Sequence, residues 1–135
     1  MKKIIVVLLM LGFVVSASYA QKLNASKVPA AVTSAFAKNH VSTKVSWTKE
    51  ETNYEAEFKL NGKETSEVYT ANGVVTETET EIKVAEFPDA VKMKLKGQKI
   101  TEAAKITKAD GTVIYEAEVN GKDLLFDAKG NPVKK

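Results

Sequence analysis

The sequence contains no cysteine among its 135 residues. The chain can therefore form no disulfide, no thiolate zinc site and no redox pair, and it offers no cysteine nucleophile. Lipid attachment through an N-terminal cysteine is excluded as well. The length allows one ordinary domain or two very small units that share one core.

Arginine is also absent, so all 20 basic residues are lysines, and histidine occurs once, as His40. Arginine is the preferred side chain for bidentate contacts with phosphates and bases, and its absence argues against nucleic-acid recognition. Acids and lysines are mixed along the chain without a basic block, which is typical of a solvated surface. A single histidine leaves almost nothing for a histidine-based metal site or a Ser–His triad.

The longest apolar run lies at the N-terminus, from Ile4 to Val15, directly after Lys2 and Lys3. Ser18 and Ala20 then occupy the two positions that a signal peptidase recognises, so we expect residues 1–20 to be a cleaved secretory signal. The run is shorter than the ~20 residues of a spanning helix, which makes a retained anchor the less favoured alternative. Cleavage removes two lysines and lowers the formal net charge from +3 to +1. We therefore expect export to the periplasm or the exterior, with 21–25 as an N-terminal tail.

The rest of the chain repeats itself at an offset of about 59 residues. Val28-Pro29 corresponds to Phe87-Pro88, and Asn61-Gly62-Lys63 corresponds to Asn120-Gly121-Lys122. Tyr-Glu-Ala-Glu also occurs twice, beginning at residues 54 and 115. Ordered matches of this kind indicate internal duplication, and we predict two tandem copies, residues 26–83 and 84–135, packed as one compact unit.

Each copy is predicted to fold as a short helix followed by three to four antiparallel strands. Apolar residues recur at helical spacing directly after each apolar-Pro pair, and alternating segments punctuated by Asn-Gly turns follow. The residues of the two helical stripes are Val28, Val32 and Phe36 in the first copy and Phe87, Val91 and Leu95 in the second. Strands are expected at about 44–48, 54–58, 64–70 and 74–82, and at 100–107, 112–119 and 123–127. The fold class is therefore α+β, with the helices packed on one face of the sheet.

The same ordered motifs resemble the PepSY-like, or β-lactamase-inhibitor-like, family of secreted bacterial proteins. The resemblance rests on the apolar-Pro-x-Ala-Val helix start, Trp47, Tyr54-Glu-Ala-Glu, Asn-Gly and Tyr69-x-Ala-Asn-Gly, and it covers nearly all of residues 26–135. It implies tandem helix-plus-sheet modules, export and a non-enzymatic role, with peptidases as suspected partners. The chain departs from the inhibitor itself because it has no cysteines, so no inhibitory contact is transferred to any residue.

Residues that could support catalysis or metal binding are few. His40 follows the predicted end of the first helix, where a cation complements the helix C-terminus, and we expect a structural role. Glu77, Glu79 and Glu81 would project from one strand face about 7 Å apart. Such a row could bind Ca²⁺ or act in acid–base chemistry, but its members diverge, and we expect a solvent-facing strand that resists aggregation. The segment 127–131 is similar in composition to a calcium loop but lacks the full pattern, which favours a turn.

Glu55, Glu57, Glu116 and Glu118 are the predicted partner-binding residues. They alternate with apolar residues that would face the helices, so they would line the open face of the sheet, a surface that can bind a partner. The alternative is that the same alternation describes any half-buried sheet. Trp47 and the tyrosines at 54, 69 and 115 have charged neighbours, which places them in the core.

The predicted function is that of a secreted, non-catalytic binding module. It would dock or restrain an exported protein, such as a peptidase, another hydrolase or a sensor, through the open sheet face. No catalytic residue, metal site, cofactor or nucleic-acid partner is expected, nor is membrane insertion after signal cleavage. The alternative is an envelope protein that binds a small ligand or Ca²⁺ through surface carboxylates. A hydrolase that uses His40 or a carboxylate pair is the least favoured of the three.

Overall fold

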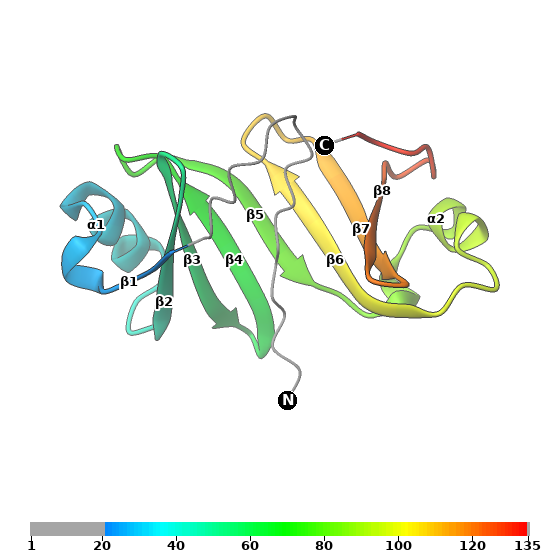
Figure 1. Cartoon of the computed structure of the whole chain (residues 1–135), viewed down its shortest axis with the longest axis horizontal. Helices are drawn as coiled ribbons and strands as arrows, with labels where there is room; N and C mark the ends of the chain where they lie inside the picture. Colours follow the sequence, from blue (N-terminus) through cyan, green and yellow to red (C-terminus); the bar gives the residue numbers. More distant parts are fainter. Residues whose placement is uncertain (1–20, 135) are drawn as a thin grey trace. The chain divides into compact units, whose positions relative to one another are not determined.

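The computed structural model describes residues 21–134, so the predicted signal, residues 1–20, lies outside the described residues (Figure 1). The strands are β1 (Gln21–Leu23), β2 (Val45–Glu50), β3 (Asn53–Leu60), β4 (Lys63–Tyr69), β5 (Val75–Glu81), β6 (Ile100–Lys108), β7 (Val113–Val119) and β8 (Lys122–Phe126). The helices are α1 (Ala30–Asn39) and α2 (Asp89–Lys94), with the short 3-10 helices η1 (Ala25–Lys27) and η2 (Val84–Glu86). The described chain divides into an N-terminal unit, residues 21–80 with 107–112, and a C-terminal unit, residues 81–106 with 113–134.

The N-terminal unit is an antiparallel sheet of β1 to β5 in sequence order, with α1 packed on one face. Val32 and Phe36 of α1 are buried because the helical period places them on the same side. They meet the sheet residues that alternate inward, chiefly Trp47, Ala56, Phe58 and Tyr69. The ring of Phe36 contacts those of Trp47 and Phe58 edge-on, with centroids 5.5 Å and 5.0 Å apart. The predicted helical stripe and the core placement of Trp47 and Tyr69 are confirmed.

The C-terminal unit builds a second core from α2 and the strands β6 to β8. Phe87, Val91 and Leu95 pack against alternating residues of the strands, which include Ala103, Ala117, Val119 and Phe126. The last described segment follows β8: Val133 donates its backbone N–H to the Leu125 carbonyl at 2.9 Å, and Pro132 forms an isolated bridge with Phe126.

The two Asn-Gly turns have the backbone that the sequence predicts. Asn61 and Gly62 have φ of 52° and 77°, and Asn120 and Gly121 have φ of 51° and 74°. Positive φ at both central residues defines the turn type that matches the twist of a two-residue hairpin, which is why Asn-Gly is favoured there. The turns join β3 to β4 and β7 to β8 with no further loop residues.

Two features of the backbone differ from the prediction. Residues 21–23 form the short strand β1, paired with residues 47–49 of β2, instead of a free tail. Gly97 is the C-terminal stop that the sequence suggests for the second helix, but α2 already ends at Lys94. Residues 95–97 form a turn, and Gly97 has a φ of 81° there. Neither difference alters the predicted order of helix and strands.

In each unit, a loop that contains a glycine packs against the first turn of the helix. An added Cβ at Gly73 would lie 2.4 Å from the Ala31 carbonyl oxygen, and one at Gly130 would lie 2.7 Å from that of Ala90. Both glycines have positive φ, 83° and 79°. The turns that follow β4 and β8 therefore pack so closely on their helices that only glycine fits.

Candidate functional site

Glutamates of the N-terminal unit gather on the sheet face opposite α1, and we name four of them, Glu55, Glu57, Glu77 and Glu79, the acidic face. The register places Glu57, Ser66 and Glu79 side by side on β3, β4 and β5. The adjacent row consists of Glu55, Val68 and Glu77. Neighbouring strands lie about 4.8 Å apart, so two carboxylates in one row are separated by roughly 10 Å with one side chain between them.

Glu55 is the most unusual member of the acidic face because its side chain is only 2% exposed. Burial, the nearby Glu50 carboxylate and a hydrogen bond with Glu57 together raise the pKa of Glu55 to about 9, with smaller contributions from the charges of Glu57 and Glu79. The Oε2 atom of Glu55 has no hydrogen-bond partner among the described residues. The structure thus holds one neutral carboxyl group among acidic neighbours, with an unused oxygen.

The stability of the protein should fall as the pH rises from about 5 to 9. The unfolded chain releases the Glu55 proton near its ordinary value of 4.5, whereas the folded chain holds it until about 9. Because the unfolded state binds fewer protons in this window, stability decreases by up to ~1.4 kcal/mol per pH unit. Urea unfolding at pH 5, 7 and 9 measures this slope, and Glu55→Gln should flatten it.

Glu118→Gln is the matched control, since it removes the same formal charge in the other unit. It should keep the wild-type slope between pH 5 and 9. A Glu55→Gln protein whose unfolding midpoint changes with pH as steeply as that of the wild type would show that Glu55 does not carry the effect.

Glu57 is half-buried and lies at the rim of a shallow depression of about 350 Å³. The depression is lined by Thr43, Lys44, Ser46, Glu57, Phe58, Lys59 and Glu64. Lys59 Nζ and Glu64 Oε1 lie 3.7 Å apart at its edge, where Lys59 is exposed and Glu64 is partly exposed. The part of the acidic face that a partner can reach therefore begins at Glu57, whereas Glu55 lies beneath the surface.

Glu116 and Glu118, the other predicted site residues, are half-buried on β7 in the C-terminal unit. Glu118 accepts a hydrogen bond from the Thr101 hydroxyl at 3.0 Å. Their face also carries a small apolar cluster of Ile106, Ile114 and Leu125, with Val133 packed against it. This cluster was not predicted. Ile114 follows the pattern opposite to Tyr115, and Leu125 the pattern opposite to Phe126, so the sequence does indicate apolar residues on both faces of these strands. That the four glutamates bind a partner stays a prediction. Glu55 and Glu57 lie together on β3 of the N-terminal unit, and Glu116 and Glu118 lie together on β7 of the C-terminal unit.

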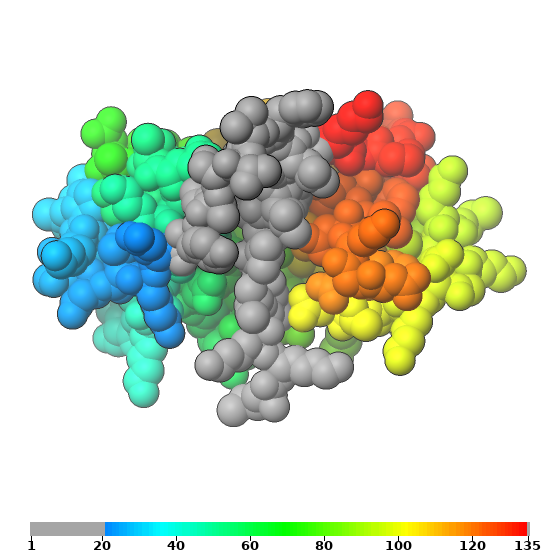
Figure 2. Space-filling view, viewed as in Figure 1, coloured from blue at the N-terminus to red at the C-terminus, as the bar shows by residue number. Residues whose placement is uncertain are grey.

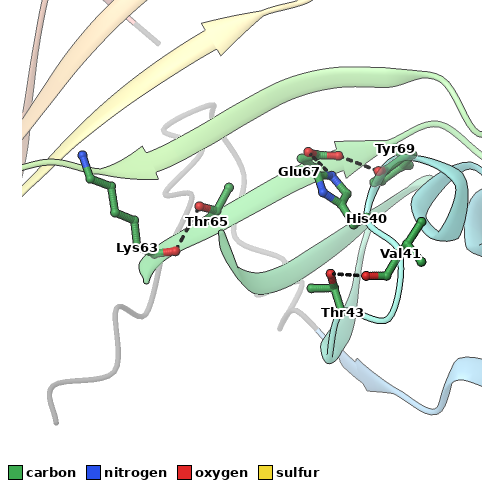
Figure 3. A network of polar contacts seen from close by, with 7 residues as sticks. All are labelled: His40, Val41, Thr43, Lys63, Thr65, Glu67 and Tyr69. Atoms are coloured by element: carbon green, nitrogen blue, oxygen red, sulfur yellow. Dashed lines mark hydrogen bonds and ion pairs between the residues drawn. The ribbon is translucent and has the colours of Figure 1, made fainter. Parts of the chain in front are cut away.

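His40 belongs to a buried polar cluster on the α1 side of the sheet (Figure 3). Its Nε2 lies 2.7 Å from Glu67 Oε1, and the Tyr69 hydroxyl donates to Glu67 Oε2 at 2.5 Å. Glu67 is 7% exposed and Tyr69 is fully buried, and the His40 ring packs on those of Phe36 and Phe58. Burial and the Glu67 carboxylate raise the pKa of Tyr69 above its usual value, so its hydroxyl remains a donor. The predicted position of His40 at the end of the first helix is confirmed, and its hydrogen bond with Glu67 is a contact that the sequence does not predict.

The other carboxylates of interest do not converge. Among residues 21–134, no group of three or more His, Cys, Asp or Glu side chains is arranged to hold a metal ion. Glu79 is buried, whereas Glu81 is exposed. Asp127 closes a turn by accepting hydrogen bonds from the backbone N–H groups of Lys129 and Asn131, both at 2.9 Å, and the Asn131 contacts lower its pKa. The predicted turn at residues 127–131 is confirmed.

Comparison with known proteins identifies the fold. The chain superimposes on a protein from Bacteroides eggerthii, assigned provisionally to the periplasm, with a TM-score of 0.73 and 21% identity over 79% of this chain and 86% of that one. It also superimposes on a DUF2874 family protein from Bacteroides uniformis (TM-score 0.71, 22% identity, 78% and 86% of the two chains). A BLIP-like protein from Bacteroides fragilis gives a TM-score of 0.62 and 20% identity over 78% and 84%.

The protein therefore has a BLIP-like α+β fold. At this level of sequence identity the likeness establishes the architecture and leaves the activity open. No protein-family profile and no curated protein sequence matches the chain. The predicted resemblance to β-lactamase-inhibitor-like proteins is confirmed for the fold, and the relation to PepSY modules stays a prediction. No helix among the described residues has the length and apolar character needed to cross a membrane.

Proposed function

We propose that this protein is an exported, non-catalytic module that binds another exported protein through the acidic face of its N-terminal unit. The observation that carries the proposal is the buried Glu55 carboxyl group, whose Oε2 has no partner among the described residues. Leaving a buried polar atom unpaired costs about 1–3 kcal/mol, so a partner group that displaces the side chains covering Glu55 and donates to Oε2 gains this energy. The surrounding Glu57, Glu77 and Glu79 set the sign of the charge that such a group should carry.

The partner that fits this face presents lysine or arginine side chains. A cation that approaches Glu55 would favour its ionised form and lower its pKa, because opposite charges stabilise each other in a partly buried site. Glu57, at the rim, would steer the approach, since rim charges act mainly on the association rate. A peptidase, another hydrolase or a sensor protein of the cell envelope can each present such a basic segment. Glu116 and Glu118 would contribute a second, smaller patch from the C-terminal unit.

The comparisons support the export and the binding role without assigning either to this chain. One relative in fold is provisionally periplasmic and another is BLIP-like, and residues 1–20 have the layout of a secretory signal. The tandem arrangement that we propose, residues 26–83 and 84–135, is supported by the glycine contact that recurs at Gly73 and Gly130. A non-catalytic role is supported by His40, because the ring of the one histidine of the chain packs on Phe36 and Phe58 and its side chain is only 11% exposed.

Charge reversal at the four predicted residues tests the proposal. The tagged chain 21–135 is used to capture partners from the envelope extract of the source cell, in parallel with the variant Glu55→Lys, Glu57→Lys, Glu116→Lys, Glu118→Lys. We expect one stoichiometric partner with the wild-type chain and at least a ten-fold loss with the variant, because like charges across an interface cost several kcal/mol. Glu57→Lys alone, at the accessible rim, should account for most of the loss in association rate.

The matched control reverses two exposed acids away from all four glutamates, Glu51→Lys and Asp89→Lys, and it should retain the partner. Equal capture by the wild-type chain and the four-fold variant would exclude binding through these four glutamates. A calcium titration of the wild-type chain separates the alternative function: a rise in melting temperature at millimolar Ca²⁺ would favour a metal-binding protein, since a ligand that binds only the native state stabilises it.

A further inference from the structure

The segment around α2 carries the densest group of lysines in the C-terminal unit. The lysines are Lys92, Lys94, Lys96 and Lys99, and all four are exposed. They alternate with uncharged residues, so the sequence shows no uninterrupted basic block. The folded segment nevertheless brings four positive charges together within eight residues of one short helix and its following loop, whose side chains project from the surface in yellow-green (Figure 2).

Few acids neutralise this group. Lys92 lies 3.6 Å from Asp89 one turn away, and the carboxylate of Asp89 is 98% exposed. Lys94, Lys96 and Lys99 form no ion pair with any described residue. An exposed pair such as Lys92–Asp89 is worth little and breaks easily when a stronger counterion approaches. The cluster therefore keeps most of its charge available for an external anion.

An apolar side chain stands in the middle of the lysines. Met93 is 78% exposed and is flanked by Lys92 and Lys94. Helical residues two positions apart differ by about 200° in direction, so Met93 points away from the buried Val91 and Leu95 that anchor α2 to the sheet. An exposed methionine between two lysines gains nothing from packing within the unit, but it could enter an apolar environment offered by a partner.

The corresponding part of the first unit shows that the fold does not require these lysines. At the offset of 59, the equivalents of Lys92, Met93, Lys94 and Lys96 are Thr33, Ser34, Ala35 and Ala37. Helix α1 packs on its own sheet through an equivalent stripe, and Ser34 and Ala37 lie exposed on its remaining surface. Helix α1 therefore packs with one exposed lysine, Lys38, so the fold does not require the lysine group or Met93 of the second unit.

We propose that this surface, Lys92–Lys94, Lys96 and Lys99, docks on an anionic lipid bilayer, with the lysines at the headgroups and Met93 at the apolar boundary. A cationic rim around a central apolar side chain matches the arrangement of a membrane surface, where charge lies outside and hydrocarbon inside. A lysine near an anionic surface contributes about a five-fold gain in affinity. Four lysines then give half-saturation at roughly 1–2 mM accessible lipid, a weak and reversible association.

Vesicle co-sedimentation tests this surface. The chain 21–135, the predicted mature form, is mixed with vesicles of phosphatidylcholine alone or with an equal share of phosphatidylglycerol. We expect binding only to the anionic vesicles, weakened when NaCl is raised from about 20 to 200 mM, because salt screens exposed charges. The variant Lys92→Gln, Lys94→Gln, Lys96→Gln should lose about 100-fold in affinity at five-fold per lysine, and Met93→Ser should lose about three- to ten-fold.

The matched control is Lys27→Gln, Lys38→Gln, Lys44→Gln, which removes three exposed lysines from the N-terminal unit and should bind anionic vesicles like the wild type. Far-UV circular dichroism confirms that each variant is folded. Equal losses in both triple variants would show a general charge effect and overturn the proposal. Equal binding to neutral and anionic vesicles would overturn it as well. So would a Met93→Ser protein that binds as tightly as the wild type, because the lysines would then bind any polyanion without the methionine entering a bilayer.

Discussion

Replacing Gly73 by alanine is expected to destabilise the protein by about 3 kcal/mol or more. The new methyl group would lie 2.4 Å from the carbonyl oxygen of Ala31 and 3.0 Å from its carbonyl carbon. These are backbone atoms of the first turn of α1, so they cannot rotate away as a side chain could. The residue would also have to hold a φ of 83°, which costs a residue with a Cβ roughly 1–2 kcal/mol. Overpacking of a fitted contact adds about 1–3 kcal/mol.

Gly62→Ala is the control that separates the two causes. Gly62 has a nearly equal φ of 77°, but an added Cβ there meets no atom within 4 Å. This variant should lose only about 1 kcal/mol, the cost of the left-handed backbone. Urea unfolding followed by circular dichroism measures both changes. If Gly73→Ala and Gly62→Ala were equally stable, the close approach of the turn to α1 would be refuted.

Gly130→Ala provides a second test of the same contact in the C-terminal unit. An added Cβ there would lie 2.7 Å from the Ala90 carbonyl oxygen and 3.0 Å from its carbonyl carbon. We expect a loss of about 3 kcal/mol, slightly less than at Gly73 because the overlap is smaller. A loss of similar size in both units would show that the turn-to-helix contact is a shared structural requirement.

Most of the fold could be predicted from local signals that do not depend on distant residues. The Asn-Gly pairs at 61 and 120 fix two hairpins because both residues adopt positive φ there. Pro29 and Pro88 precede the helices directly, at the N-cap, where the missing N–H removes no helical bond. Alternation along β3 then places Ala56 and Phe58 toward α1 and the glutamates on the opposite face, as predicted.

The chemistry of the buried acids could not be predicted, because it depends on which side chains meet across strands. Glu55 was expected on an open face, but its neighbours bury it and raise its pKa to about 9. Glu67 lies on the α1 side of β4. Most residues of β4 are polar on both faces, so its sequence does not indicate that a carboxylate faces the core. Its partners, His40 and Tyr69, come from the helix end and from the same strand, so only the folded backbone brings the three together.

Glu67→Ala is expected to cost about 3–4 kcal/mol of stability, and it tests whether this cluster ties α1 to the sheet. The substitution removes the acceptors of both His40 Nε2 and the Tyr69 hydroxyl. Tyr69 is fully buried, so its hydroxyl would be left without its partner and without water, at about 1–3 kcal/mol. His40 loses a charge-assisted contact at 2.7 Å, and the truncation leaves a cavity beside α1.

A double-mutant cycle assigns this loss to the network instead of to general truncation. Tyr69→Phe alone should cost about 1 kcal/mol, because it removes the donor but leaves Glu67 bound to His40. In the Glu67→Ala background the same Tyr69→Phe change should be neutral or stabilising, since the hydroxyl no longer has a partner to lose. The coupling energy between the two positions is therefore expected at about 1–2 kcal/mol. Asp123→Ala, at an exposed site in the other unit, should change stability by less than ~0.5 kcal/mol. A coupling energy near zero would mean that the short contact between Tyr69 and Glu67 does not stabilise the folded state, and the attachment of α1 would then rest on its apolar contacts alone.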